Sequence, residues 1–120
     1  MVGKSQEWGG IAKNGAKMVN AVANCKVPKI TLVFGASYGA GNYGMCGRAY
    51  EPDFMFTWPM SKLSVMGGEQ AAKVMTSIKK NLSENEKKIY YEKLKEKYNK
   101  ESEAIYGTAR LWDDGIIFPE

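Results

Sequence analysis

A glycine-rich run is the part of this sequence best suited to chemistry. It covers residues 35–44, reads Gly-Ala-Ser-Tyr-Gly-Ala-Gly-Asn-Tyr-Gly, and directly follows a short apolar run. Glycine and alanine leave the backbone uncovered, so main-chain N–H groups can point at a ligand oxygen. A helix beginning near Ala40 would add the positive end of its dipole at the same place. We interpret the run as an oxyanion hole; the alternative is a tight turn in which glycine only lets a helix pack on a strand.

The same run also matches the nucleophile elbow of hydrolases, glycine-x-serine-x-glycine, with Ser37 in the serine position. In that site a histidine takes the proton of the serine. The 120 residues contain no histidine. We therefore do not expect Ser37 to be a nucleophile.

A third match is to the dinucleotide fingerprint, which Gly39, Gly41 and Gly44 fit in spacing. That motif needs its first glycine directly at the end of a strand, and an acidic residue at the end of the next strand. Here four residues separate the apolar run 30–34 from Gly39, and the nearby acids precede the next predicted strand. The motif is misplaced for a dinucleotide.

Composition narrows the chemistry further. The absence of histidine removes the commonest general base and the commonest zinc ligand, so we expect no metal site. Any reaction must use carboxylates, amines, a bound cofactor or the backbone. The net charge is +4, which alone would suit a nucleic acid partner. However, eight lysines and six glutamates are interleaved between Lys79 and Glu103. Such a pattern is typical of a solvated helix face, so we expect no nucleic acid partner.

The chain has the size and apolar content of one compact domain, with 120 residues of which 44% are hydrophobic. No apolar run approaches the ~18–20 residues that cross a bilayer, and the first residues lack a signal-peptide pattern. Two cysteines, Cys25 and Cys46, do not make a disulfide framework. We expect both to be reduced, buried thiols of an intracellular protein.

Periodicity predicts strands that alternate with helices. Helical spacing of apolar residues predicts a helix over 10–24, which Pro28 prevents from continuing. Residues 30–34 are apolar and β-branched, and predict a fully buried strand. Further strands are predicted at 54–58 and 63–66.

The remaining elements are predicted from their start signals. Gly67 and Gly68 end the third predicted strand, and residues 69–75 are predicted to form the beginning of a helix. Ser83 and Glu86 form a capping-box pattern before a helix that places Tyr90, Leu94 and Tyr98 on one face. A turn at 113–115 precedes an apolar segment at 116–118. The fold class is therefore α/β or mixed α+β.

Five blocks of the sequence are recognisable in their order, at residues 10–17, 28–31, 35–50, 64–72 and 109–117. The glycine-rich run and the Met-Gly-Gly-Glu-Gln block that begins at Met66 are highly specific. Together the blocks closely resemble the β subunits of methylcrotonyl-CoA carboxylase, and geranyl-CoA carboxylase is similar. The resemblance implies a crotonase-like fold, with residues 1–120 lying inside the C-terminal CoA-carboxyltransferase domain and the N-terminal domain absent from this chain.

The resemblance also implies a reaction. Carboxybiotin carried on a partner subunit releases carbon dioxide, the biotin nitrogen takes a proton from the acyl-CoA, and the resulting dienolate attacks the carbon dioxide. Negative charge develops on the biotin ureido oxygen, and in the family its N–H donors lie at the small residues that match Ala40 and Gly41. Because the cofactor is the base, no histidine is needed. The substrate implied is 3-methylcrotonyl-CoA or a related branched enoyl-CoA of leucine degradation.

Other residues and partners follow from the same resemblance. We expect Tyr38, Gly39, Gly67 and Gly68 to line the biotin site. The partners implied are the biotin-carrying α subunit, with its biotin carboxylase, and other copies of the β subunit. The location implied is the cytoplasm of a bacterium or the mitochondrial matrix of a eukaryote. A different class remains open: a crotonase-like binding or interaction module without activity.

Three side chains near the run invite a catalytic interpretation that we do not favour. Glu69 in the first turn of a helix is typically a dipole and capping feature. Arg48 has the charge to meet a CoA phosphate, but an internal salt bridge or a helix cap is the simpler interpretation. Tyr43 is expected to pack in the core more than to wall the biotin pocket, and for Tyr38 core packing is the alternative to lining that pocket.

Overall fold

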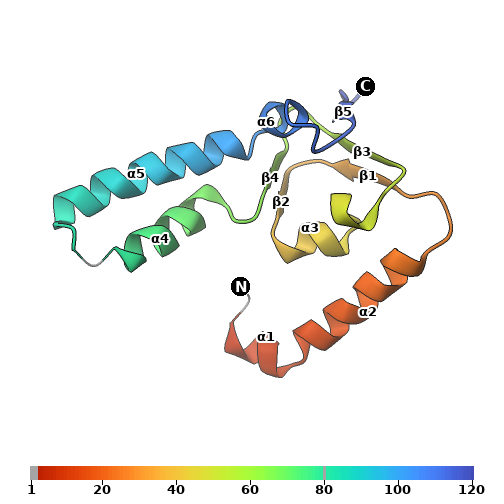
Figure 1. The fold of residues 1–120 in the computed structure, drawn as a ribbon, viewed down its shortest axis with the longest axis horizontal. Helices are drawn as coiled ribbons and strands as arrows, with labels where there is room; N and C mark the ends of the chain where they lie inside the picture. Colours follow the sequence, from red (N-terminus) through yellow and green to blue (C-terminus); the bar gives the residue numbers. More distant parts are fainter. Residues whose placement is uncertain (1–2, 80) are drawn as a thin grey trace.

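Two small parallel sheets form the framework around the glycine-rich run (Figure 1). The structure is a computed structural model that describes residues 3–79 and 81–120. In the first sheet the strand order is β1–β3–β5, with bounds Ile30–Val33, Phe54–Thr57 and Gly115–Ile116. In the second sheet β2 (Ala36–Tyr38) pairs with β4 (Lys62–Ser64). All these pairs are parallel, and the predicted α/β class is confirmed.

The predicted helix at 10–24 is confirmed as α2 (Ile11–Asn24), which the short helix α1 (Lys4–Trp8) precedes. Gly10 caps α2 in a left-handed conformation, with φ 85°. The helix packs on α3 (Ala40–Gly44), where a Cβ added to Gly44 would collide with the Met18 side chain. The end of the Met18 side chain therefore occupies the space beside Gly44, where α2 and α3 meet.

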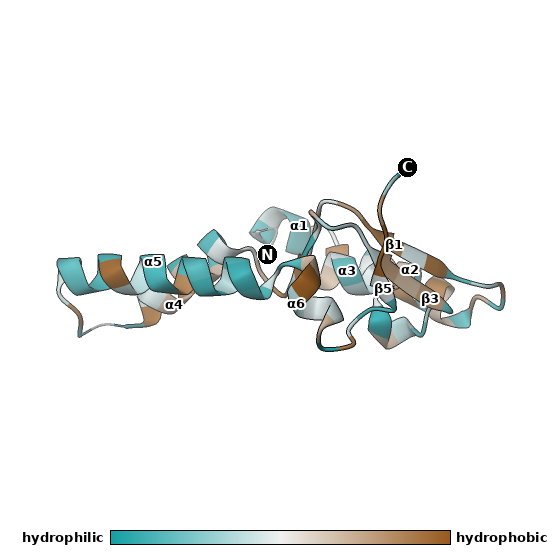
Figure 2. Ribbon diagram, turned by 90° about the horizontal axis from the view of Figure 1, so that it is seen from above, coloured by the Kyte–Doolittle hydropathy of each residue, from teal (hydrophilic) through white to brown (hydrophobic). Residues whose placement is uncertain are grey.

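The strand predicted at 30–34 is present, but the prediction that it is fully buried is wrong. Val33 is buried, whereas Ile30 and Phe34 are 69% and 66% exposed. The exposed side chains of β1 lie on the same face as aromatic residues of β3, where the Phe34 and Trp58 rings lie 5.5 Å apart. Figure 2 shows this apolar colouring on β1 and β3. Within the part of the chain that the structure describes, nothing covers this face, which explains the difference.

The strand predicted at 54–58 is confirmed as β3, but the third strand lies at Lys62–Ser64 and ends before Met66. The reason is local: the Ser64 hydroxyl accepts a hydrogen bond from the Met66 amide at 3.2 Å, which turns the chain. Strand β2, only three residues long inside the glycine-rich run, was not predicted. The short helices α1 and η1 (Arg48–Tyr50) were not predicted either.

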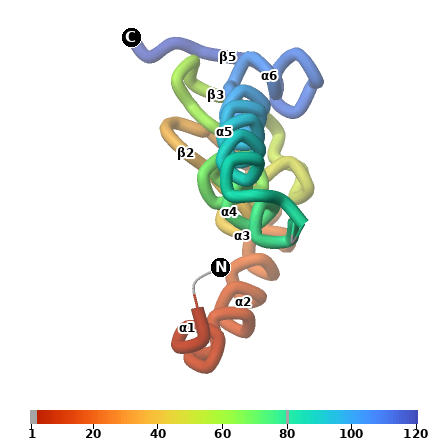
Figure 3. Tube along the Cα trace, turned by 90° about the vertical axis from the view of Figure 1, so that its left-hand side faces the viewer, coloured from red at the N-terminus to blue at the C-terminus, as the bar shows by residue number. Residues whose placement is uncertain are grey.

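A helical hairpin projects from the sheets (Figures 1 and 3). It consists of α4 (Gly68–Ile78) and α5 (Glu84–Glu101), and α6 (Ala104–Thr108) leads back to the sheets. The predicted capping box of α5 is confirmed, since Ser83 and Glu86 each bond the backbone of the other. The predicted face of α5 is half-buried, whereas the rest of the helix is mostly exposed and polar (Figure 2).

Candidate functional site

Two glycine-containing turns meet at the carboxyl end of the second sheet. Because β2 and β4 are parallel with Tyr38 opposite Ser64, the turns that follow these strands lie next to each other. The Gly39 amide donates to the Ser64 carbonyl at 3.0 Å. A Cβ on Gly39 would lie 3.2 Å from the Val65 carbonyl oxygen, and its φ is 63°. Both the close approach and the left-handed backbone therefore favour glycine here.

The Tyr38 ring lies against the second turn. A Cβ added to Gly67 would lie 3.4 Å from Cε2 of this ring. Tyr38, Gly39 and Gly67, three of the residues predicted for the site, are thus brought together by the strand pairing. The arrangement depends on the parallel register, which the sequence alone did not define.

Ala40 and Gly41 are the first two residues of α3, directly after the cap residue Gly39. The first amides of a helix have no acceptor within the helix. In the described ranges, neither the Ala40 amide nor the Gly41 amide donates a hydrogen bond, whereas the Asn42 amide donates to the Gly39 carbonyl at 3.1 Å. Both residues are exposed, and a Cβ at Gly41 would meet nothing within 4 Å. Two adjacent N–H groups are therefore free to bind an oxygen atom.

Gly68 lies deeper than its neighbour Gly67. It is buried, and a Cβ there would collide with the Asn99 amide group and lie 3.0 Å from the Lys95 carbonyl oxygen. Gly68 thus allows α4 to approach α5 closely at the start of the hairpin. Close helix packing explains glycine at this position without a ligand.

A cavity of about 660 Å³ opens beside the two turns. Gly39, Tyr43 and Arg48 line it together with mostly apolar side chains, among them Met55, Leu63, Val65, Met66, Val74, Met75, Tyr98, Tyr106 and Trp112. An apolar cavity of this size beside a few polar groups is typical of a small-molecule site. Tyr43 lines this cavity and is 51% exposed, so the prediction that it packs mainly in the core is wrong.

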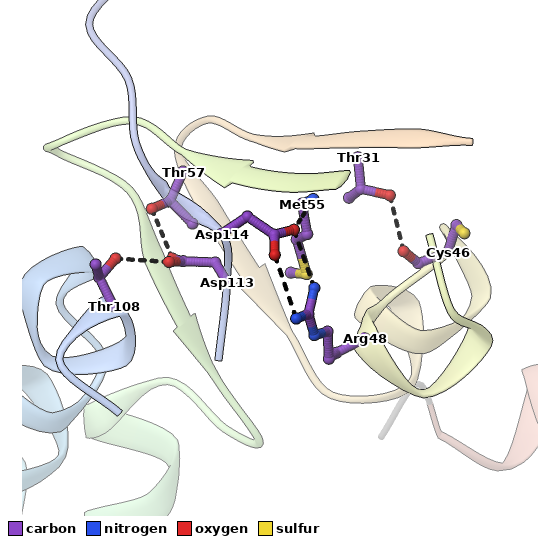
Figure 4. A network of polar contacts seen from close by, with 8 residues as sticks. All are labelled: Thr31, Cys46, Arg48, Met55, Thr57, Thr108, Asp113 and Asp114. Carbon is purple, nitrogen blue, oxygen red and sulfur yellow. Dashed lines mark hydrogen bonds and ion pairs between the residues drawn. The ribbon is translucent and has the colours of Figure 1, made fainter. Parts of the chain in front are cut away.

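Arg48 forms an internal ion pair, as the simpler interpretation predicted. Its guanidinium contacts the Asp114 carboxylate at 3.0 and 3.3 Å (Figure 4). The Met55 amide also donates to Asp114, at 2.7 Å. The hydrogen bond from Met55, and then the one from Arg48, hold the pKa of Asp114 below its usual range. These contacts fasten η1, just after the glycine-rich run, to β3 and to the chain before β5.

Glu69 lies in the first turn of α4, and its carboxylate contacts Lys95 of α5 at 3.3 Å. This hydrogen bond and the charge of Glu69 raise the pKa of Lys95. Glu69 is exposed, so its role here is a surface ion pair between the two helices of the hairpin.

The surroundings of Ser37 and of the two cysteines can be compared with the predictions. The Ser37 hydroxyl accepts a hydrogen bond from the Asn42 side chain at 3.0 Å. Both cysteines are free, but the prediction that they are buried is wrong: Cys25 is exposed and Cys46 is half-buried. Cys25 directly follows α2, and this end of the helix is not covered by other described residues. We did not select Asn42 from the sequence. An asparagine three residues after Gly39 is nevertheless a residue type that often hydrogen-bonds to a nearby turn.

Residues 3–79 and 81–120 contain neither a metal-binding cluster nor a membrane-spanning helix. No group of three or more histidine, cysteine, aspartate or glutamate side chains there is placed to hold a metal ion. None of the described helices combines the length and apolar character that crossing a membrane requires.

Comparison with known proteins identifies the family. The model of the carboxyl transferase domain matches residues 1–120. The chain is 52% identical, over 128 residues, to the mitochondrial methylcrotonoyl-CoA carboxylase beta chain of Dictyostelium discoideum, covering 100% of this chain and 22% of that protein. It is 51% identical to the biotin-dependent 3-methylcrotonyl-coenzyme A carboxylase beta1 subunit of Mycobacterium tuberculosis, covering 99% of this chain and 24% of that protein.

The fold agrees with the sequence. The crystal structure of the P. aeruginosa geranyl-CoA carboxylase beta subunit matches with a TM-score of 0.91 and 48% identity, covering 98% of this chain and 23% of that one. This chain thus spans less than a quarter of the length of these relatives. It has the crotonase-like fold of the carboxyltransferases, and it belongs to the carboxyl transferase domain family.

Proposed function

We propose that this chain is part of the C-terminal domain of a biotin-dependent acyl-CoA carboxylase, where it holds biotin during carboxyl transfer. The acyl acceptor is 3-methylcrotonyl-CoA or a related branched enoyl-CoA, as the names of its relatives indicate. The proposal extends to the whole enzyme, because the relatives are about four times longer. The N-terminal domain, supplied by the rest of such a subunit, binds the CoA thioester.

The observation that carries the proposal is the pair of free amides at Ala40 and Gly41. They are adjacent, exposed and without an acceptor among the described residues. Together with Gly39, whose Cβ would crowd the Val65 carbonyl, they form a bare stretch of backbone that fits the urea of biotin. Biotin, when bound, supplies the carboxyl group and the proton acceptor.

The chain's own groups would act through the backbone. The Ala40 and Gly41 amides donate hydrogen bonds to the ureido oxygen, where negative charge grows in the transition state. Since α3 begins at Ala40, its dipole adds to the attraction, although a helix of five residues contributes little alone. Tyr38 and the Met66–Gly68 turn bound the site beside these donors.

The proposed partners are a biotin-carrying α subunit with biotin carboxylase activity and other copies of the same β subunit. This follows from the subunit names of the relatives, beta chain and beta1 subunit, which imply a partner chain. We place the enzyme in the mitochondrial matrix if the source is a eukaryote and in the cytoplasm if it is a bacterium.

Replacement of Ala40 by proline tests the amide pair. Proline removes one N–H group but is well tolerated at the first position of a helix. In the holoenzyme that carries this segment, Ala40→Pro should lower kcat for carboxylation of 3-methylcrotonyl-CoA on the order of 100–1,000-fold. The matched control is Glu84→Pro, at the first position of the remote and exposed helix α5, which should leave kcat unchanged.

Either of two results would contradict the proposal. One is an Ala40→Pro enzyme that turns over at the rate of the unmodified one. The other is carboxylation of methylcrotonyl-CoA by the isolated 120 residues, which would overturn the assignment of the thioester to another domain. A holoenzyme that binds acyl-CoA but transfers no carboxyl group would favour a binding module instead.

A further inference from the structure

The side chain of Asn42 connects the two ends of the turn that presents the free amides. Its Nδ2 donates to the Ser37 hydroxyl oxygen at 3.0 Å, and the contact is partly buried. Ser37 lies in β2, before the turn, and Asn42 lies in α3, after it. Ala40 and Gly41 therefore lie in the chain between two residues whose side chains are hydrogen-bonded to each other.

The backbone of Asn42 is fixed as well. Its amide donates to the Gly39 carbonyl at 3.1 Å, which closes the turn from inside. On its other side, a Cβ on the buried Gly47 would lie 2.6 Å from Oδ1 of Asn42 and 2.9 Å from its carbonyl oxygen. Gly47 thus provides the space that the Asn42 side chain occupies.

The end of this segment is attached to the first sheet. The Thr31 hydroxyl of β1 donates to the Cys46 carbonyl at 2.8 Å (Figure 4). Residues 37–47 are therefore held at both ends, by Ser37 in one sheet and by Thr31 in the other. Between these points Asn42 makes the side-chain hydrogen bond nearest to the free amides.

The turn needs a hydrogen bond such as that between Asn42 and Ser37 to hold its conformation. Two of its residues are glycines, which lose more backbone freedom than others when they are ordered. Helix α3 has five residues, and its cap residue Gly39 offers no side-chain hydrogen bond. So short a helix has little stability of its own.

We propose that Asn42 is a positioning residue for the amides of Ala40 and Gly41, with Ser37 as its anchor. The inference rests on the proposed function and deepens it. It also accounts for the serine of the glycine-x-serine-x-glycine match, which accepts a hydrogen bond in a chain without histidine. Asn42 and Ser37 act through the direction of the two N–H groups, and neither contacts the reacting atoms.

The experiment uses the carboxylase holoenzyme that carries this segment, assayed with free biotin, ATP, bicarbonate and 3-methylcrotonyl-CoA, so that its biotin carboxylase forms the carboxyl donor. Asn42→Ala and Ser37→Ala should each lower kcat by roughly 10–100-fold, because a small displacement of a catalytic group is costly. The KM for acyl-CoA should stay within about twofold, since the thioester binds another domain. Ser37→Thr keeps the hydroxyl and should recover most of the kcat lost in Ser37→Ala.

Two further variants distinguish loss of the Asn42–Ser37 hydrogen bond from general damage to the structure. Asn24→Ala removes an asparagine whose bonds stay within the exposed end of α2, and it should leave kcat unchanged. The double variant Ser37→Ala/Asn42→Ala should be no slower than the slower single variant, because both remove the same hydrogen bond.

The possible failures are distinguishable. If the unmodified holoenzyme transfers no carboxyl group, the proposed function fails. If it is active but Asn42→Ala and Ser37→Ala turn over at its rate, the positioning role is overturned. It is also overturned if the losses of the two variants multiply, or if Asn42→Ala raises the KM for biotin and leaves kcat unchanged, which would make Asn42 a direct binding contact.

Discussion

Asp113 shows how single hydrogen bonds attach the C-terminal segment to the first sheet. Its buried carboxylate accepts a hydrogen bond from the Thr57 hydroxyl at 2.9 Å and another from the Thr108 hydroxyl at 2.7 Å (Figure 4). A buried carboxylate is costly unless such donors satisfy it. The two threonines therefore join β3, α6 and the chain before β5. The sequence predicted only a turn here, since nothing in it indicated which hydroxyls would face the carboxylates.

Replacement of Thr57 by valine tests this network. The change keeps the shape of the side chain but removes one donor from a buried carboxylate, so we expect a local loss of about 1–3 kcal/mol. Hydrogen exchange of the β3 amides, measured by mass spectrometry on the holoenzyme, should increase accordingly.

A matched control is Thr76→Val in α4. The Thr76 hydroxyl is buried and has no hydrogen-bond partner among described residues, so its loss should be neutral or stabilising. Equal exchange in β3 for Thr57→Val and the unmodified protein would show that the Thr57 hydroxyl contributes nothing to the network.

Secondary structure elements with strong local signals were predicted well. Helix α2 lies between Gly10 and Pro28, and the capping box at Ser83 defines the start of α5. Elements without such signals were missed: β2 has three residues, and what stabilises it is pairing with β4, far along the chain. The sequence proposes the site residues but not their geometry, because it does not show that the Tyr38 ring lies against Gly67.

The close approach of α4 and α5 predicts opposite effects of the same substitution at two helical glycines. Gly68→Ala places a methyl group against Asn99 and the Lys95 carbonyl, so it should push α4 away from α5 and speed hydrogen exchange in both helices. Gly15→Ala lies in α2, where a Cβ meets nothing within 4 Å, and should stabilise by about 0.4–1 kcal/mol.

The matched pair separates packing from helix propensity, since alanine is the better helix former at both positions. Unchanged exchange of α4 and α5 in Gly68→Ala would mean that the hairpin tolerates the methyl group. The packing explanation for Gly68 would then be wrong, and its place beside the proposed biotin site would become the better reason for glycine.

At the scale of the whole molecule, the chain exposes more surface than a compact domain of its mass. Its solvent-accessible area is 9002 Å², against roughly 6,500 Å² expected for 13.3 kDa. Its radius of gyration is 17.0 Å, against about 14 Å for a globular chain of this length. The same exposure accounts for the incorrect prediction of a fully buried β1, because no described residue covers the face that carries Ile30 and Phe34.

The relatives are longer than this chain, which covers 22–24% of their length. We therefore propose that two regions of the subunit divide the work. In this proposal the present segment contributes the backbone amides of Ala40 and Gly41, and another region binds the thioester. Such a division can be tested directly by locating biotin in the enzyme.

The most direct measurement is a crystal structure of the holoenzyme soaked with biotin. We expect the ureido oxygen to lie about 3 Å from the amide nitrogens of both Ala40 and Gly41. Tyr38 and the Met66–Gly68 turn should then border the bicyclic ring. Biotin bound with its urea directed away from these nitrogens, or amides that bond to other protein groups in the assembled enzyme, would contradict it.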